Sequence, residues 1–216
     1  MITFPHARIR TSRNASARTN DRNDAVAPTG RFDFGFGAVR ARRHINPDGT
    51  LGGWVAATAH ADPEAHIGAD ALIFGNARVF GACQLKDEVR VFDYARIAGG
   101  ASISGAASVG GSATVDGARV EGQARIRDHA RLSDGADVFG NAVVSGDAVI
   151  GPRTIVRDSS VVTGSSFVGA DCIIAGESLV SGVVPSSSVV TDALIEPATV
   201  PVTAPTLPTA AASIAA

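Results

Sequence analysis

Histidine and arginine are the side chains of this 216-residue chain whose types and spacing could do chemistry. An imidazole titrates near neutral pH and can act as a general base, and a guanidinium binds phosphates and carboxylates through paired N–H donors. Of the five histidines, His129 follows Asp128, an acidic neighbour that could orient its ring. Many of the arginines recur at multiples of six residues, so their placement depends on a repeat.

The repeat is an aliphatic residue about every six positions, with one five-residue step at Asp116-Gly117. Its members are Ile67, Ile73, Val79, Leu85, Val91, Ile97, Ile103, Val109, Val115, Val120, Ile126, Leu132, Val138, Val144, Ile150, Val156, Val162, Val168, Ile174 and Val180. A second column lies two residues earlier and holds small side chains, except at Val89. Two columns of this regularity predict a repeat architecture.

The spacing predicts short strands joined by turns. Residues two apart in a strand point to the same face, so the small and aliphatic columns both face inward. Gly, Asp and Asn follow the aliphatic residue and favour turns, as in Gly75-Asn76 and Asp134-Gly135. Each strand can pair with the strand eighteen residues later. The chain is therefore predicted to be all-β, a single-stranded parallel β-helix of about seven triangular coils.

The motif of an aliphatic residue, Gly, two variable residues and a small residue resembles the hexapeptide repeat of left-handed β-helix proteins. The segment from Glu177 to Val190 is similar to the last coil of hexapeptide acyltransferases. The segment from Asp48 to Val55, followed by Gly75 to Gly81, resembles the YdcK-like transferases in particular. The resemblance implies a left-handed helix over residues 55–196, an acyl-CoA-type donor as co-substrate, and no covalently bound cofactor.

The outward column between the two inward ones is rich in arginine. Arg78, Arg96 and Arg131 are expected on one face of the prism, and Arg90 and Arg125 on another. Adjacent rungs lie about 5 Å apart, so neighbouring guanidinium groups repel each other by about 1 kcal/mol in water. Two interpretations remain: a solvated face neutralised by acidic residues (Asp87, Glu88, Asp93 and Asp128), or a phosphate ladder for a donor such as coenzyme A.

The resemblance implies a histidine as general base on an acceptor hydroxyl or amine, with His129 as first candidate and His66 as second. Each histidine could instead be an ordinary surface residue. The three zinc histidines of γ-carbonic anhydrases are not reproduced, because no two histidines are five residues apart, and no metal site is expected. The repeat also lacks an inserted loop that could build an acceptor site. This favours an alternative function as a non-catalytic β-helix: a scaffold, a phage-type structural module or a secreted binding protein.

Towards the C-terminus the outward column becomes apolar at seven successive positions: Val143, Val149, Ile155, Val161, Phe167, Ile173 and Leu179. A monomer rarely exposes so large an apolar patch, so another subunit, the C-terminal tail or a partner should cover it. The resemblance implies a homotrimer with active sites between subunits.

The ends of the chain differ from the repeat. Residues 1–30 are predicted to be a disordered Arg-rich tail, residues 31–54 an arm that caps the first coil, and residues 197–216 a disordered Pro- and Ala-rich tail. Residues 1–43 have a net charge of +6 and residues 44–216 a net charge of −8. An acidic prism without stacking aromatics argues against a nucleic-acid partner.

The subcellular localisation is predicted from features that the sequence lacks. No apolar run reaches 18 residues, so no membrane span is expected. Cys83 and Cys172 fall in the inward column about five coils apart and are predicted to be buried thiols. A cytoplasmic protein is the default expectation. The Arg-rich start also resembles transit peptides and secretion signals, which keeps secretion as an alternative.

Overall fold

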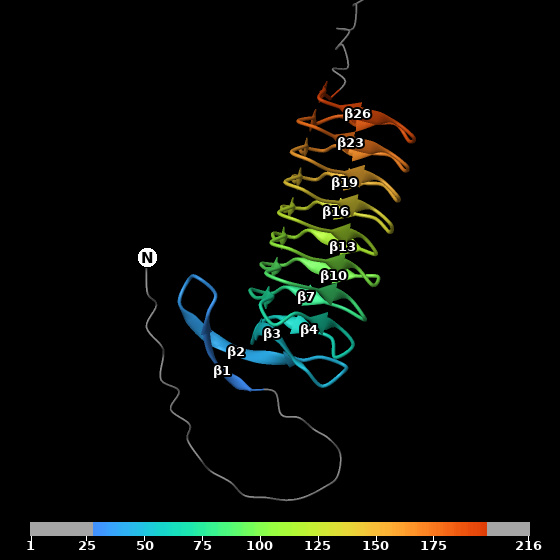
Figure 1. The fold of residues 1–216 in the computed structure, drawn as a ribbon. Helices are drawn as coiled ribbons and strands as arrows, with labels where there is room; N and C mark the ends of the chain where they lie inside the picture. The colour runs from blue at the N-terminus through green and yellow to red at the C-terminus, as the bar shows by residue number, and fades with distance from the viewer. Residues whose placement is uncertain (1–27, 198–216) are drawn as a thin grey trace, which may run out of the picture.

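The computed structural model describes residues 28–197, which form a tall stack of short parallel strands without any helix in that range (Figure 1). The predicted terminal tails lie outside these residues, apart from the few at their inner ends. The all-β prediction and the stacked parallel coils are confirmed. The hand of the coil stays a prediction.

Three sheets form the three faces of the stack. Sheet B has eight strands: β4 (His60–Ala61), β7 (Arg78–Val79), β10 (Arg96–Ala98), β13 (Thr114–Asp116), β16 (Arg131–Leu132), β19 (Val149–Ile150), β22 (Phe167–Val168) and β25 (Val183–Val184). Sheet C also has eight: β5 (His66–Ile67), β8 (Gln84–Leu85), β11 (Ser102–Ile103), β14 (Arg119–Val120), β17 (Asp137–Val138), β20 (Ile155–Val156), β23 (Ile173–Ala175) and β26 (Val189–Thr191).

Sheet A has eleven strands and extends below the others. They are β1 (Thr29–Asp33), β2 (Ala38–Ile45), β3 (Leu51–Ala56), β6 (Leu72–Ile73), β9 (Arg90–Val91), β12 (Ser108–Val109), β15 (Arg125–Ile126), β18 (Val143–Val144), β21 (Val161–Val162), β24 (Leu179–Val180) and β27 (Leu194–Ile195). The stack thus has about eight coils, not seven. The repeat count began at Ile67 and ended at Val180, and so missed strands that lack the full pattern, such as β4 and β25.

The core consists of the two inward columns. The aliphatic column is buried throughout, and so is the small column beside it, Val89 included. Four members of the small column are hydroxyl residues in the upper coils, and they bond to nearby carbonyls: the Ser160 hydroxyl donates to Arg157 O at 2.7 Å, and that of Thr154 donates to Gly169 O at 2.7 Å. Cys83 and Cys172 are both buried free thiols, as predicted.

Turn aspartates fasten each coil to the next. Asp87, Asp93 and Asp128 have φ values of 57°, 58° and 61°, a region that Asp tolerates better than most residues. The carboxylate of each accepts a hydrogen bond from the backbone N–H of a glycine eighteen residues later, at 3.0, 3.2 and 3.0 Å respectively. These side chains are therefore part of the stacking.

The five-residue step leaves the stack intact. Ser102 of β11 pairs with Arg119 of β14, seventeen residues on instead of eighteen, and Ile103 still pairs with Val120. The turn at Gly117, with φ of 63°, takes up the missing residue, so the inward columns keep their alignment.

Three antiparallel strands, β1 to β3, cover the segment that was predicted to be a capping arm. Strand β2 pairs with β1 and with β3, and two of its neighbouring side chains reach the first coil of sheet C. The Asn46 amide bonds both backbone groups of Ile67, accepting from its N–H at 2.8 Å and donating to its carbonyl at 3.2 Å. His44 Nε2–H donates to Ala65 O at 2.8 Å. The backbone edge of strand β5 is thereby satisfied without another strand.

Candidate functional site

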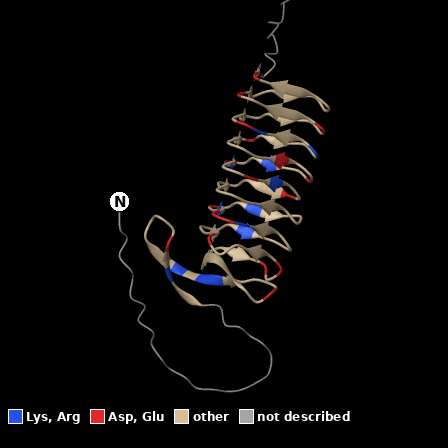
Figure 2. Ribbon diagram, in the orientation of Figure 1, with Lys and Arg blue, Asp and Glu red and all other residues tan. Residues whose placement is uncertain are grey.

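The arginines of the outward column gather on the N-terminal half of the stack (Figure 2). On sheet B, Arg78 of β7 pairs in register with Arg96 of β10. Thr114 of β13 separates Arg96 from Arg131 of β16. On sheet A, Ser108 likewise separates Arg90 from Arg125. The structure places these arginines on the faces that the six-residue spacing predicted.

Three of the four acidic residues expected to neutralise the ladder bond to the backbone instead. The carboxylates of Asp87, Asp93 and Asp128 bond to backbone N–H groups of the next coil. Within residues 28–197, no carboxylate forms an ion pair with Arg78, Arg96 or Arg131. Direct ion pairs between these three aspartates and the ladder are therefore not seen, because the turn geometry uses their carboxylates. The interpretation as a solvated face stays a prediction. The exposed guanidinium groups are left available to an external anion.

An aromatic contact positions the Arg96 side chain. The Arg96 guanidinium lies 5.0 Å from the centre of the Phe80 ring, in cation–π contact. On the other side of Phe80, the centre of the His60 ring of β4 lies 6.0 Å from the centre of the phenyl ring, with 45° between the two ring planes. Phe80 follows β7 and thus links the first and third strands of sheet B.

His60 and Asp62 form a hydrogen-bonded pair at the foot of sheet B. His60 Nε2 lies 2.6 Å from one carboxylate oxygen of Asp62, and the other oxygen accepts the Gly81 N–H at 2.7 Å. The Gly81 N–H and His60 both lower the pKa of the Asp62 carboxyl, so it is anionic at neutral pH. A carboxylate held in place by the backbone fixes the imidazole in one orientation, which is the arrangement that a general base needs.

The structure brings His60 next to the arginines. His60 of β4 pairs in register with Arg78 of β7, one rung below Arg96. His60 was not among the candidate bases predicted from the sequence, which were His129 and His66. The available signal was the spacing His60-Ala61-Asp62, because residues two apart in a strand share a face.

His129 lies between β15 and β16, at the corner of sheets A and B, and is 69% exposed. Its Nδ1 is 3.6 Å from Asp147 of the next coil. Asp128 was expected to orient the His129 ring but does not, because its carboxylate accepts the Gly146 N–H. His129 thus lies near Arg131 in sequence, two rungs above Arg96. It belongs to a different part of the face from the His60 pair.

His66, the second candidate, is half-buried on sheet C and pairs in register with Gln84. None of the arginines of sheet B shares that face. Within the described part of the chain, no three His, Cys, Asp or Glu side chains are placed to hold a metal ion. No helix there is long and apolar enough to cross a membrane.

Above Asp137 the outward column is apolar, and it is partly exposed on all three faces. The seven predicted positions run from Val143 to Leu179, with Phe167 51% exposed and Leu179 41% exposed. The apolar outward column continues beyond the predicted range to Val183, Val189 and Leu194, which are still more exposed. The lower prism is thus polar and arginine-rich, and the upper prism is apolar.

Comparison with known proteins finds similarity among solved structures. No protein-family model and no curated protein sequence matches the chain. The chain is similar to the acetyltransferase domain of PglB from Neisseria gonorrhoeae FA1090, solved in complex with acetyl coenzyme A, with 20% identity and a TM-score of 0.27. The match covers 56% of this chain and 54% of that one, so it spans about half the length of its neighbour. The fold assignment rests on the strand register of this chain itself.

Proposed function

We propose that the protein is an acyltransferase of the hexapeptide-repeat type that binds an acyl-CoA-type donor along sheet B. One observation supports this most: the His60–Asp62 pair lies directly below two arginines, Arg78 and Arg96, that have no carboxylate partner among residues 28–197. An oriented base beside unpaired guanidinium groups suits transfer from a phosphate-bearing donor.

The roles follow from position on the sheet. Arg78 and Arg96 bind phosphates of the donor, and Phe80 keeps the Arg96 guanidinium in place. Arg131 lies two rungs further along, roughly 10 Å from Arg96, and extends the same line for an elongated ligand.

His60 acts as general base through Nδ1, because Nε2–H donates to Asp62. It takes the proton of an acceptor hydroxyl or amine as that atom attacks the thioester carbon. A bond from the acceptor to the acyl carbon forms and the carbon–sulfur bond breaks. The proton then passes from His60 to the departing thiolate, and the Asp62 carboxylate stabilises the intermediate imidazolium.

In this proposal the apolar upper coils assemble chains, as a homotrimer, through the outward positions from Val143 to Leu179. His129 and His66 are retained as alternative bases, which would act only if a neighbouring subunit completed a site around them.

A non-catalytic scaffold is the second candidate, and the connections favour it. Between β4 and β27, successive strands are joined by two to four residues. No connection there is long enough to project as a loop and close over a substrate. The two candidates differ in whether the lower half of sheet B binds a donor.

Calorimetric titration of the assembled protein with acetyl-CoA and with coenzyme A tests the proposal. Saturable binding that Arg96→Gln weakens by about tenfold, and that weakens further as salt rises, is expected. Arg125→Gln on sheet A is the matched control and should bind as the wild type does. If neither ligand gives heat at millimolar concentration, or if both variants bind equally well, the scaffold is the better account.

A further inference from the structure

A second group of arginines lies on the hairpin below the prism, away from sheet B. Arg31 of β1 pairs directly with Arg40 of β2, and Thr29 pairs with Arg42. Because alternate residues of a strand share a face, Arg31, Arg40 and Arg42 all project from the same side of this two-stranded ribbon.

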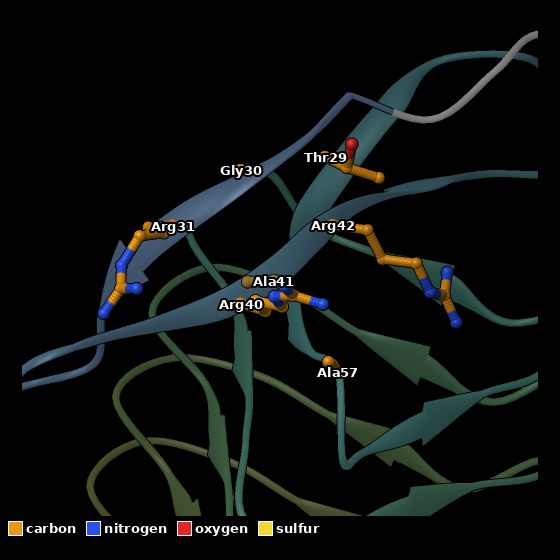
Figure 3. A pocket seen from close by; sticks show the side chains of 7 residues that line it. All are labelled: Thr29, Gly30, Arg31, Arg40, Ala41, Arg42 and Ala57. Carbon is orange, nitrogen blue, oxygen red and sulfur yellow. The ribbon is translucent and has the colours of Figure 1, made fainter.

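These side chains line a cleft of about 480 Å³ (Figure 3). Its walls are Thr29, Gly30, Arg31, Arg40, Ala41, Arg42 and Ala57. The floor is fixed by the sheet: Ala41 is buried against Ala56 of β3, and the Ala57 N–H donates to Arg40 O at 2.9 Å. A volume of this size, on a scaffold held by strand pairing, is typical of a small-molecule site.

The positive charge of the cleft is not neutralised by the described part of the chain. No ion pair involves Arg31, Arg40 or Arg42 in residues 28–197. The nearest carboxylate on the ribbon, Asp33, accepts the N–H groups of Gly35 and Gly37 at 2.8 and 2.9 Å, and these bonds lower its pKa.

Like charges placed directly opposite each other destabilise a strand pair. A bound anion would therefore stabilise three arginines on one face of a ribbon.

We propose that this cleft binds an oligophosphate, as inorganic triphosphate or as the phosphate chain of a nucleoside triphosphate. The opposed pair Arg31 and Arg40 lies about 5 Å apart across the strands, and Arg42 lies about 7 Å further along β2. The Arg31 guanidinium donates to Ala38 O at 2.5 Å and so points along the ribbon away from Arg42 (Figure 3). Three guanidinium groups arranged in a row in this way match a chain of linked phosphates better than one isolated phosphate or carboxylate. The Thr29 hydroxyl adds a neutral donor.

An adjoining hollow provides room for the rest of a nucleotide. It has a volume of about 340 Å³ and shares Arg40 and Ala57 with the cleft. Phe36, Val39 and Ala56 give it an apolar lining, and Phe36 is 61% exposed. A nucleoside seated here would give tighter binding than the phosphate chain alone.

Calorimetry of the full chain with sodium tripolyphosphate and with ATP tests this site. The titrations use the Arg78→Gln/Arg96→Gln double variant as well as the wild type, so that any phosphate binding on sheet B is removed. Saturable binding of one ligand per chain is expected in both proteins. Adding Arg40→Gln should weaken it by at least tenfold, whereas the control Arg125→Gln should not. Failure of the donor site on sheet B would leave this result unchanged.

The two sources of the ligand are separated by comparing affinities. ATP binding that is tighter than tripolyphosphate binding, with the difference lost in Phe36→Ala, identifies a nucleotide; equal affinities identify the phosphate chain. Both support the proposal. The proposal is overturned if neither ligand binds saturably, or if Arg40→Gln binds them as tightly as the protein without that substitution. Binding of a single-stranded oligonucleotide more than 100-fold tighter than ATP also overturns it and would identify a polymer surface.

A stability measurement keeps the test valid if a variant binds nothing. Arg40→Gln removes a cation opposite Arg31, so its thermal midpoint without ligand should equal or exceed that of the wild type. The midpoint of the wild type should rise with tripolyphosphate, and that of Arg40→Gln should not. A wild-type midpoint that tripolyphosphate does not change contradicts the site.

Discussion

At the residue scale, the position of a histidine relative to a fixed carboxylate decides which one is suited to chemistry. Asp62 is held by the Gly81 N–H and lies 2.6 Å from His60, whereas Asp147 lies 3.6 Å from an exposed His129. Sequence reasoning chose His129 because Asp128 is adjacent in the chain. Asp128 instead adopts a positive φ and bonds to the next coil, and neighbours in sequence do not reveal such contacts across coils.

The His60 pair predicts a separation of binding from rate. His60→Ala should reduce acyl transfer by about 100-fold or more while leaving donor affinity unchanged, because the imidazole acts on the acceptor. Asp62→Asn should also slow transfer, because an amide does not stabilise the imidazolium. His129→Ala is the matched control and should transfer at the wild-type rate. The assay is release of the coenzyme A thiol with a panel of amine and hydroxyl acceptors. Equal rates in His60→Ala and wild type would assign the base elsewhere.

His44 predicts a pH dependence of stability. Burial lowers the pKa of its imidazole, which donates from Nε2 to Ala65 O in its neutral form. The stability that the neutral ring provides is present above the unfolded pKa of about 6.5 and is lost as pH falls through the lower folded value. The thermal midpoint should therefore fall between pH 7 and pH 5. His44→Gln, which can still donate to Ala65 O, should show a flatter profile, and an equally steep one would contradict this role.

At the element scale, the repeat was predictable and the ends were not. The inward columns, the outward arginine faces and the effect of the five-residue step all follow from strand alternation. The hairpin below the prism follows no repeat. Its packing depends on particular contacts. The ring centres of Phe34 and Phe74 lie 5.2 Å apart, and the Asn46 amide bonds to the backbone of Ile67. The sequence shows these residues but does not show their partners.

The Asn46 amide predicts local stability at the first coil. Asn46→Ala removes both bonds to Ile67 and should destabilise the chain by about 1–3 kcal/mol, since buried backbone groups lose their partners. Asn46→Asp keeps an acceptor for the Ile67 N–H but places an oxygen against its carbonyl, so it should destabilise as well. Thermal unfolding and amide exchange at Ile67 measure the effect. Unchanged exchange at Ile67 in Asn46→Ala would show that the cap is dispensable.

The small inward column predicts intolerance to added volume. Ala124 is fully buried, and Ala124→Leu should destabilise by roughly 1–3 kcal/mol or more because the coil has no room for the extra methylene groups. Ala106→Leu, at an exposed turn position, is the matched control and should have little effect. Chemical denaturation of both variants measures the difference. Equal stabilities would mean that the column does not fill the core.

At the scale of the whole molecule, the outward strand positions are rich in arginine in the lower half of the stack and apolar in the upper half. In the outward strand positions the change falls at Asp137 of β17, after which the strands of all three sheets begin with an apolar residue. The apolar run was readable from the sequence up to Leu179. Its extension to Val183, Val189 and Leu194 was not, because the spacing between paired strands shortens to fifteen or sixteen residues there.

The apolar half predicts self-association. Phe167→Asp places a charge on a side chain that is 51% exposed in the single chain and should dissociate the oligomer or make the protein insoluble. Thr114→Asp, in the same outward column of sheet B, is the matched control and should leave the assembly intact. Light scattering at micromolar concentration measures both. A soluble wild-type monomer would contradict the assembly.

The proposed function requires that the lower half of sheet B binds an acyl-CoA-type donor beside His60. A crystal structure of the protein with acetyl-CoA tests it most directly. We expect donor phosphates on Arg78 and Arg96 and a thioester within reach of His60 Nδ1. A donor bound on another face, with sheet B empty, would contradict it.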